Sequence, residues 1–338
     1  MTRPARAYAA AGVDLAFGRE AKEGLRAAAE STRTPLVVHG FGAFGGAIRV
    51  PPGYAEPVLV TSIDGLGTKL HLAIAWGRAR DAGRDLVNHC INDIAVHNAR
   101  PLAFQDYVAS GSLGTAVLVA LVEGMAEACR VAGIALVGGE TAQMPDTYQP
   151  GAYDVAGAIV GIAERSLMPS PAAVMAGDVL VGLPALGLHT NGFSLARRTA
   201  ERLGPEHRVG DANLADALLA PHPSYLPQLQ RAFGVPGTRV AAHITGGGLG
   251  ENVPRVLPAH LAARITLGAW RVPPVFDTIQ GDQGIGDAEM YQVFNMGVGL
   301  TIVAAPSASE RLLAELPGAF RAGVIVPRRG DGVELAGA

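Results

Sequence analysis

Short apolar runs separated by glycine-rich turns constrain the fold of this chain more than any other feature. The 338 residues include 44 glycines and 23 prolines, which cluster between the apolar runs and do not recur at a fixed period. This pattern is typical of buried strands and helices joined by many loops, and it excludes a collagen-like or disordered chain. The length predicts two domains.

The segment at 58–70 shows how one such run ends. An apolar run at 58–60 leads to Asp64, Gly65, Gly67, Thr68 and Lys69. A strand followed by an acid and glycines delivers a carboxylate to the edge of a sheet. The glycines let backbone N–H groups approach an anion, and the lysine adds a point charge. Because the spacing is not that of a Walker A loop, we interpret the segment as a site for a metal-bound phosphate, with a plain turn at a strand end as the alternative.

Other acids in the first half lie near the ends of apolar runs. Asp106 lies in an expected strand at 104–109, and Asp93 follows Asn92 on an expected helix at 85–99. Glu140 and Thr141 follow an expected strand at 134–137, with a glycine pair as the turn that leaves it. Carboxylates gathered at one sheet edge would hold Mg²⁺, although helix caps and turn formers remain the alternative.

One helix face carries His89, Asp93 and His97 at intervals of four residues. A transition-metal site would need a further His or Cys with ligand spacing, which does not accompany them. We therefore interpret these residues as a polar helix face.

Glycine-rich loops also occur elsewhere. Three glycines precede an expected helix at 249–256, where exposed N–H groups and the helix dipole favour a phosphate; a flexible loop is the alternative. His189 and Asn191, in the loop at 187–192, are candidates for hydrogen bonds to a substrate, with a turn residue before the following helix as the alternative for Asn191.

A stretch rich in proline and serine at 166–171 marks the best domain boundary, which predicts domains at 1–165 and 172–335. Further strands are expected at 153–163, 179–183, 298–304 and 324–326. Further helices are expected at 19–30, 115–132 and 194–202.

Charge and composition exclude several classes of protein. The net charge of −3 gives no overall attraction to nucleic acid or anionic lipid. Cys90 and Cys129 lie in apolar helix-like patterns and are expected to pack in the core. The basic N-terminal residues are not followed by an apolar signal region, and no apolar run reaches the roughly 18 residues of a membrane span, so a soluble cytoplasmic protein is expected.

Taken together, the motifs resemble the phosphoribosylformylglycinamidine cyclo-ligases, also called aminoimidazole ribonucleotide synthetases, of purine biosynthesis. The matching segments run in order along nearly the whole chain, at 8–14, 64–70, 92–94, 138–145, 153–157, 187–195, 243–248 and 294–299. The chain departs from the family pattern at Gln143, where Glu is usual, at Asp146, where Gly is frequent, and at 75–84 and 291–293.

The resemblance implies an α/β fold of the α+β type with two domains, in a homodimer whose N-terminal sheets form a barrel with ATP bound nearby. It implies ATP-dependent ring closure of formylglycinamidine ribonucleotide to 5-aminoimidazole ribonucleotide, with release of ADP and phosphate. The cofactors would be ATP and Mg²⁺, with a monovalent cation as a further candidate.

Residue roles follow from the resemblance together with the motifs. Asp64, Asp93 and Glu140 are assigned to Mg²⁺. The catalytic set is Lys69 on the phosphates, Asp93, and His189 and Asn191 on the substrate. The expected cofactor-binding residues are Gly45, Gly46, Asp64, Gly65, Gly67, Thr68, Asn92, Asp106, Glu140, Thr141, Gly246, Gly247 and Gly248.

Two other functions are compatible with parts of this pattern. Another ATP enzyme of the same superfamily, such as a thiamine-monophosphate kinase or a selenophosphate synthetase, would share the acid–glycine strand ends. It would not be expected to carry His189 and Asn191 together with the three glycines at 246–248. A non-catalytic nucleotide-binding scaffold is the second alternative, and the retained acids and Lys69 argue against it.

Overall fold

The computed structural model describes residues 17–112 and 114–337, which form two compact units. The first unit comprises the described residues up to Cys90 and Arg100–Ile162, and the second comprises Ile91–Ala99 and the described residues from Ala163 onward. The matching segment at 8–14 lies outside the described residues. No helix within the described ranges has both the length and the apolar character needed to cross a membrane.

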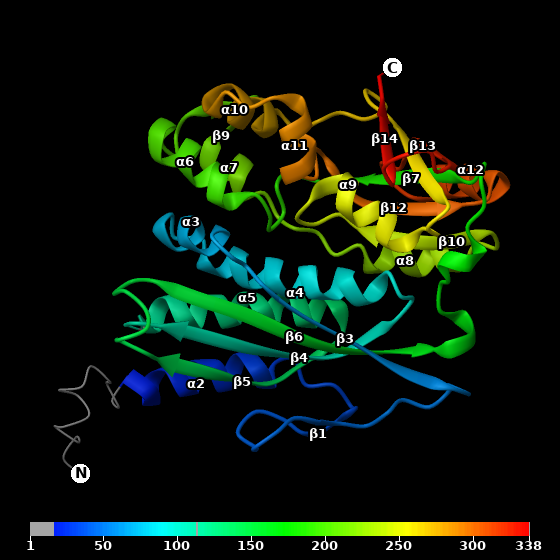
Figure 1. Ribbon diagram of the computed structural model, residues 1–338. Helices are drawn as coiled ribbons and strands as arrows, with labels where there is room; N and C mark the ends of the chain where they lie inside the picture. The colour runs from blue at the N-terminus through cyan, green and yellow to red at the C-terminus, as the bar shows by residue number, and fades with distance from the viewer. Residues whose placement is uncertain (1–16, 113, 338) are drawn as a thin grey trace, which may run out of the picture. The chain divides into compact units, whose positions relative to one another are not determined.

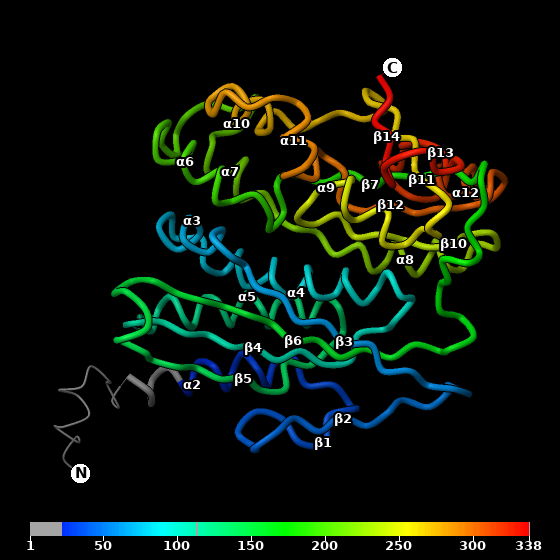
Figure 2. Tube along the Cα trace, viewed as in Figure 1, coloured from blue at the N-terminus to red at the C-terminus, as the bar shows by residue number. Residues whose placement is uncertain are grey.

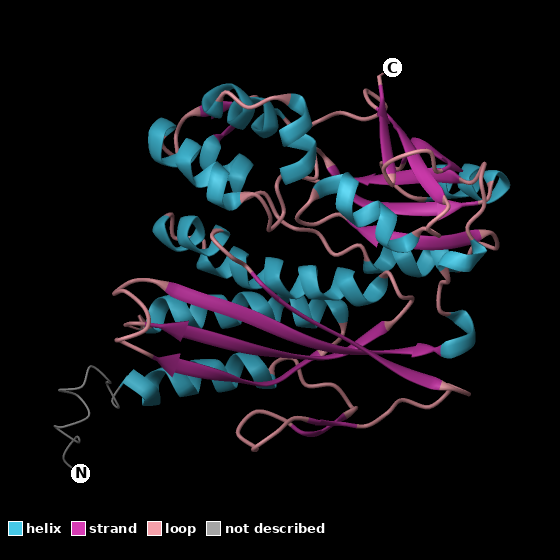
Figure 3. Cartoon of the chain, viewed as in Figure 1, coloured by secondary structure: helices cyan, strands magenta, loops and turns pink. Residues whose placement is uncertain are grey.

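A four-stranded mixed sheet with helices on one face forms the first unit (Figures 1 and 3). The strand order is β3-β6-β4-β5, with β4 antiparallel to β6 and parallel to β5. Its elements are α2 (Phe17–Glu30), β1 (Val37–His39), β2 (Ala47–Ile48), β3 (Pro57–Gly65), α3 (Lys69–Ala75), α4 (Ala79–Ala95), β4 (Arg100–Ser110), α5 (Thr115–Ala132), β5 (Ala135–Gln143) and β6 (Tyr153–Glu164).

Helices α4 and α5 pack closely because each has a glycine at the contact. A side chain on Gly83 of α4 would collide with the backbone of α5, and one on Gly124 of α5 would collide with the backbone of α4. Helix α5 ends at Gly133, whose left-handed conformation (φ 69°) closes the last turn. The helix predicted at 115–132, with its glycine stop, is confirmed, as is the packing of Cys90 and Cys129 in the core.

The glycine pair at 138–139 lies inside β5 and does not form the turn expected from the sequence. Gly139 pairs with Asp106 of β4, and a methyl group on Gly139 would collide with the Asp106 carboxylate. The register shifts at this point of the β4–β5 ladder, between Phe104 and Gln105. The glycine is therefore required by close approach across the sheet, and the strand continues to Gln143.

The two faces of the sheet differ in what covers them. On one face, the Phe104 ring and Leu86 of α4 fill the space above Gly157 of β6. On the other face, side chains of β3, β4 and β6 are wholly or partly exposed, among them Leu59 (61 %), Ile63 (74 %) and Tyr107 (36 %). Alternation along β3 produces this contrast, because successive side chains point to opposite faces.

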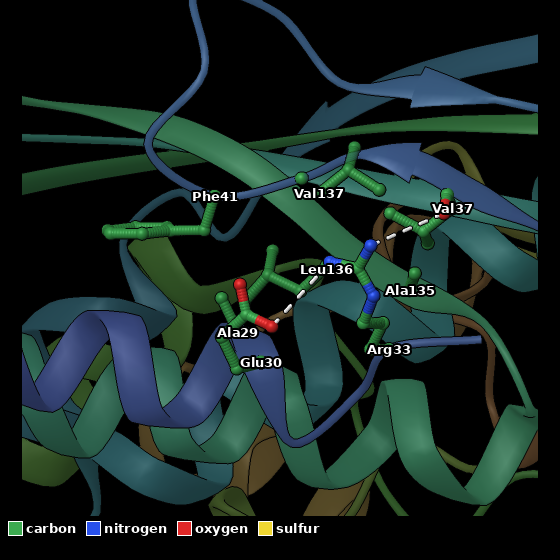
Figure 4. Close-up of a pocket in the computed structure, with 9 residues that line it drawn as sticks. Ala29, Glu30, Arg33, Val37, Phe41, Ala135, Leu136 and Val137 are labelled. Carbon is green, nitrogen blue, oxygen red and sulfur yellow. Dashed lines mark hydrogen bonds and ion pairs between the residues drawn. The ribbon is translucent and has the colours of Figure 1, made fainter. Parts of the chain in front are cut away.

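The small strands β1 and β2 pair with each other, and β1 contacts β5 (Figure 2). A shallow pocket lies beside them, between the end of α2 and β5 (Figure 4). The charged residues of the pocket contact each other and the nearby backbone: Arg33 forms an ion pair with Glu30 and donates to the Val37 carbonyl oxygen. Its lining residues are Ala29, Glu30, Arg33, Val37, Gly40, Phe41, Ala135, Leu136 and Val137.

A six-stranded mixed sheet is the centre of the second unit, in the order β10-β12-β7-β13-β11-β14. The unit contains η1 (Arg165–Leu167), η2 (Pro171–Ala173), β7 (Val179–Pro184), α6 (Phe193–Leu203), β8 (Arg208–Val209), β9 (Ala212–Asn213), α7 (Leu214–Leu218), α8 (Leu226–Phe233), β10 (Thr238–His243), α9 (Gly248–Asn252), η3 (Val253–Val256), β11 (Leu261–Thr266), α10 (Pro274–Gln283), α11 (Asp287–Val293), β12 (Val298–Ala304), α12 (Pro306–Glu315), β13 (Phe320–Pro327) and β14 (Val333–Ala336).

Strand β12 is buried along its entire length, as the apolar run at 298–304 predicts for a strand covered on both faces. It pairs with β7 on one side and β10 on the other. Apolar residues of β10, β11, β12 and β13 form the main core of the unit. The loops that follow β7 and β10, and the segment that precedes β12, carry the second-half motifs.

Candidate functional site

Asp64 lies at the end of β3, where its carboxylate is 42 % exposed. Its Oδ1 atom accepts from the Gly65 N–H at 2.6 Å, and its Oδ2 atom lies 2.6 Å from Nε2 of the buried His89 on α4. Asp93 follows His89 by four residues on α4 and therefore lies on the same helix face. An accessible carboxylate held by a backbone N–H and an imidazole offers the oxygen ligand that Mg²⁺ prefers.

Lys69, the first residue of α3, is buried with 1 % of its side chain exposed. Its Nζ atom lies 2.6 Å from Oδ2 of Asp85 on α4, which is 3 % exposed. The position of Lys69 does not support the predicted phosphate contact, because the ammonium lies in the interior beside a carboxylate. The sequence did not indicate this pairing, since Asp85 lies 16 residues further along the chain.

The glycines near Asp64 and near β2 differ in their surroundings. Gly67 is exposed, adopts a left-handed conformation (φ 52°) and has open space where a side chain would lie. Gly45 is also exposed and open, whereas a side chain on Gly46 would meet Val137 of β5. Gly67 and Gly45 are therefore accessible to a ligand, and Gly46 is a packing position. Thr68 precedes α3 without capping it through its side chain.

Asp106 lies between Gly157 of β6 and Gly139 of β5 in the sheet. Burial raises the pKa of the Asp106 carboxyl to about 7, and a hydrogen bond with its own backbone lowers the pKa only in part. The folded protein therefore favours the protonated form of this carboxyl below about pH 7.

Glu140 of β5 pairs with Tyr107 of β4 and shares its face of the sheet, which is the exposed face. Asp64 alternates with the exposed Ile63 and points to the helix-covered face, where it meets His89. Two strands also separate β3 from β5, so about 14 Å lies between them at the usual strand spacing. The structure therefore does not bring Glu140 and Asp64 together within one copy of the chain. Thr141 follows Glu140 on β5 and is partly buried.

In the second unit, the loop at 187–192 is held by the segment that precedes β12. The Asn295 side chain donates to the Gly187 carbonyl oxygen at 3.0 Å. A side chain on Gly192 would collide with the Phe294 ring. Phe294 and Asn295 thus support this loop, in which His189 is fully buried in a left-handed conformation (φ 59°).

His189 stacks on His222, with ring centroids 4.1 Å apart and planes inclined by 11°. The Tyr225 hydroxyl lies 3.5 Å from His189 Nε2 and donates to the Pro184 carbonyl oxygen at 2.8 Å. Burial raises the pKa of Tyr225, which keeps its hydroxyl protonated. A side chain on Gly299 of β12 would collide with this hydroxyl, so Gly299 makes room for the pair.

The row of imidazole rings continues from His222 through His243 to Asp93, which belongs to the same unit. His222 Nε2 lies 3.1 Å from His243 Nε2, and His243 Nδ1 lies 2.8 Å from Asp93 Oδ1. The Asn92 amide N–H also faces His222 Nε2, at 3.2 Å. Because an amide nitrogen only donates, His222 Nε2 accepts from Asn92, and because a carboxylate only accepts, His243 Nδ1 donates to Asp93. Asp93 therefore holds the His243 ring in place.

Asn92, predicted to bind the cofactor, is fully buried and holds the segment around His222. Its Nδ2 atom donates to the Pro223 carbonyl oxygen at 3.0 Å, and its Oδ1 atom accepts from the Tyr225 N–H at 2.7 Å. These contacts indicate a structural role for Asn92.

The loop at 245–248 meets the loop at 187–192. A methyl group on the exposed Gly246 would come 3.3 Å from Asn191 Oδ1. Gly248 approaches the backbone of Phe294, whose carbonyl oxygen would lie 2.6 Å from a methyl group at Gly248. Gly247 and Gly248 both have positive φ, 84° and 57°. Three motifs distant in sequence therefore converge on one place in the second unit.

Sequence reasoning missed His222, Tyr225 and Asn252. Asn252 is buried, and its amide group binds the backbone of the loop at 245–248. The prolines that flank His222 signalled a rigid segment, but the sequence offers no signal for its partners.

Two family models match the chain. The N-terminal domain of the AIR synthase related proteins matches residues 44–163, and the C-terminal domain of the same proteins matches residues 175–336. Relatives named phosphoribosylformylglycinamidine cyclo-ligase cover nearly the whole chain. The Chromobacterium violaceum protein is 42 % identical, with 96 % of each chain covered. The protein of Bifidobacterium animalis subsp. lactis is 43 % identical, with 98 % of this chain and 99 % of the relative covered.

Solved structures with more distant sequences share the fold. Thiamine-monophosphate kinase from Stenotrophomonas maltophilia has a TM-score of 0.69 at 20 % identity, with 93 % of this chain and 94 % of that chain covered. The hydrogenase maturation protein HypE of E. coli has a TM-score of 0.68 at 22 % identity, with 94 % of each chain covered. At this level of identity the likeness shows the fold alone.

Proposed function

The chain belongs to the phosphoribosylformylglycinamidine cyclo-ligase family. We propose that the first unit binds ATP and that the second unit binds the ribonucleotide substrate of that reaction. The reaction is the ATP-dependent ring closure of formylglycinamidine ribonucleotide to 5-aminoimidazole ribonucleotide, with release of ADP and phosphate, in purine biosynthesis. In the expected chemistry, phosphoryl transfer activates the formyl oxygen. A nitrogen of the same molecule then attacks that carbon and expels phosphate.

The proposed site for the ribonucleotide substrate rests on three motifs that meet in the second unit. Asn191 lies beside Gly246, and the Phe294 segment supports both of their loops. We assign Asn191 to the ribonucleotide and the loop at 246–248, through its exposed Gly246, to a phosphate group; His189, which is fully buried, would act by positioning the loop at 187–192. Ring closure is intramolecular, so holding the substrate in a folded conformation would itself contribute up to about 7–11 kcal/mol.

The first unit contributes the residues proposed for ATP. The accessible Asp64 carboxylate and the open Gly67 suit a metal-bound phosphate. Bound Mg²⁺ would neutralise phosphate charge, and Asp64 would be a protein ligand; Asp93, assigned to Mg²⁺ from the sequence, belongs to the second unit, where it binds His243. Lys69 would act through the position of α3, because its ammonium is buried against Asp85.

We also propose a homodimer that uses the exposed sheet face of the first unit. Leu59 and Ile63 are exposed apolar side chains on this face, which is unusual for a monomer surface. Glu140 shares the face, so a second copy would complete its surroundings. In light scattering, Ile63→Asp should shift the mass toward the monomer. Val131→Asp, an exposed position on α5, should leave it unchanged; equal masses for both variants would refute this interface.

The reaction is tested by incubating purified protein with ATP and Mg²⁺, with and without formylglycinamidine ribonucleotide. We expect ADP and 5-aminoimidazole ribonucleotide in a one-to-one ratio, formed only when the substrate is present. ADP without the imidazole product would instead indicate a related ATP enzyme. ATP binding without turnover would indicate a nucleotide-binding scaffold. We also propose that the protein is located in the cytoplasm.

A further inference from the structure

We propose that Asn252 is a positioning residue that orients the glycine loop at 245–248 for a phosphate group. Asn252 is 3 % exposed and lies at the end of α9. The two hydrogens of its Nδ2 atom point to the loop carbonyls of Gly248 at 2.8 Å and Gly246 at 3.0 Å, and the Thr245 carbonyl oxygen lies 3.4 Å from the same nitrogen. One side chain thus faces three of the four carbonyl oxygens of residues 245–248.

The direction of these hydrogen bonds determines where the loop N–H groups point. In a planar trans peptide, the C=O of one residue and the N–H of the next point in opposite directions. The Thr245 and Gly246 carbonyls face Asn252, so the Gly246 and Gly247 N–H groups face away from it. Two consecutive outward N–H groups form an anion-binding arrangement, and the exposed Gly246 allows close approach, whereas the Glu251 carboxylate occupies the side-chain space of Gly247.

The remaining contacts of Asn252 fix its orientation. Its Oδ1 atom accepts from the Thr245 hydroxyl at 3.2 Å and from Arg255 Nη1 at 3.2 Å. Carbonyl oxygens cannot donate, so only the amide nitrogen can face them. Arg255 also brings a positive charge to the same loop. The ligand class is a phosphate ester, carried either by ATP or by the ribonucleotide; this inference rests on the proposed function of the loop.

The decisive variant is Asn252→Asp, which preserves shape and Oδ1 but replaces the donor with an oxygen that faces three carbonyls. We expect the KM for one substrate to rise about tenfold or more, with kcat changed much less. A rise in the KM for the ribonucleotide assigns the loop to its phosphate, and a rise in the KM for ATP assigns it to ATP. The inhibition constant for inorganic phosphate against that substrate should rise in parallel.

The matched control is Asn98→Asp, the same chemical change in the same unit. It removes one side-chain hydrogen bond, from Asn98 to the Leu167 carbonyl oxygen at 3.0 Å. Asn98→Asp should leave both KM values within about twofold of wild type. If Asn252→Asp does not fold by circular dichroism, Asn252→Ser removes the same donors without adding charge and is judged by the same criterion.

Unchanged KM values in a folded Asn252 variant would overturn the proposal, as would an equal rise in Asn98→Asp. A loss of thermal stability with unchanged KM would show a purely structural role and would also overturn it. If wild type shows no turnover, the proposed function fails instead. Calorimetry with inorganic phosphate then tests Asn252 independently, and equal affinity of wild type and variant would count against it.

Discussion

The buried pair between Lys69 and Asp85 should contribute strongly to the stability of the first unit. The side chains are 1 % and 3 % exposed, and the charged atoms lie 2.6 Å apart. Removing one partner leaves an uncompensated charge in the interior, which destabilises a protein by about 3–5 kcal/mol. Lys69→Met and Asp85→Leu should each lower the free energy of unfolding by that amount.

The double variant Lys69→Met/Asp85→Leu should recover most of this loss, because replacing both charges by apolar groups is close to neutral or stabilising. The exposed pair of Arg33 and Glu30 provides the control, with side chains 49 % and 45 % exposed. Arg33→Gln should change stability by less than about 1 kcal/mol, as expected for a surface pair.

Urea denaturation of the full chain, followed by a fluorescent probe in the first unit, measures these differences in the free energy of unfolding. The chain has two tryptophans, and Trp76 lies at the end of α3. In a Trp270→Phe background, Trp76 fluorescence reports the first unit alone, and all variants are compared in that background. Single variants that lose less than about 1 kcal/mol, or a double variant no more stable than the singles, would refute the reasoning.

Activity of the double variant separates two roles of Lys69. If Lys69 acts only through the position of α3, the folded double variant should keep a KM for ATP within about threefold of wild type. Direct contact with phosphate would raise that KM by about tenfold or more, since hydrogen bonds to charged groups contribute about 1.5–3 kcal/mol.

Three further outcomes follow from the packing and charge of single positions. Gly139→Ala should lower the melting temperature through overpacking of about 1–3 kcal/mol, whereas Gly138→Ala, which has open space, should not; equal melting curves would contradict the contact. The pKa of the Asp106 carboxyl rises from its ordinary value of 3.8 to about 7 in the folded state, so between these pH values the folded state binds a proton that the unfolded state has lost. The free energy of unfolding should therefore fall as the pH rises from about 4 to about 7. In Asp106→Asn, thermal melts should lose this dependence. Tyr225→Phe should lower kcat by up to about tenfold through a less well-oriented His189, and an unchanged kcat would remove Tyr225 from the site.

Periodicity predicted the elements well because it depends only on local sequence. The β12 run, the α5 helix and its Gly133 stop all lie where the sequence places them. Helix α4 was expected at 85–99 but spans Ala79–Ala95. The order of strands within the sheets has no local signal, since β11 and β14, which pair in parallel, are separated by two other strands along the chain.

Site residues were predictable by type and less so by role. The sequence marked Asp64, His189 and Asn191 as polar residues in loops or at strand ends, which suits ligand contact. It could not reveal that Lys69 meets Asp85, or that Asn92 holds the segment before Tyr225. Such pairings depend on tertiary contacts, which composition and spacing do not determine.

The motif glycines show why a glycine-rich loop does not by itself indicate phosphate binding. Gly139 and Gly192 are required because a neighbouring carboxylate or aromatic ring occupies the place of a side chain. Gly67 faces open space in a left-handed conformation, and Gly246 is exposed beside Asn191. Only the second kind lets a ligand reach the backbone N–H groups. A glycine is therefore a good candidate for ligand binding where its missing side chain leaves room for something the protein itself does not supply.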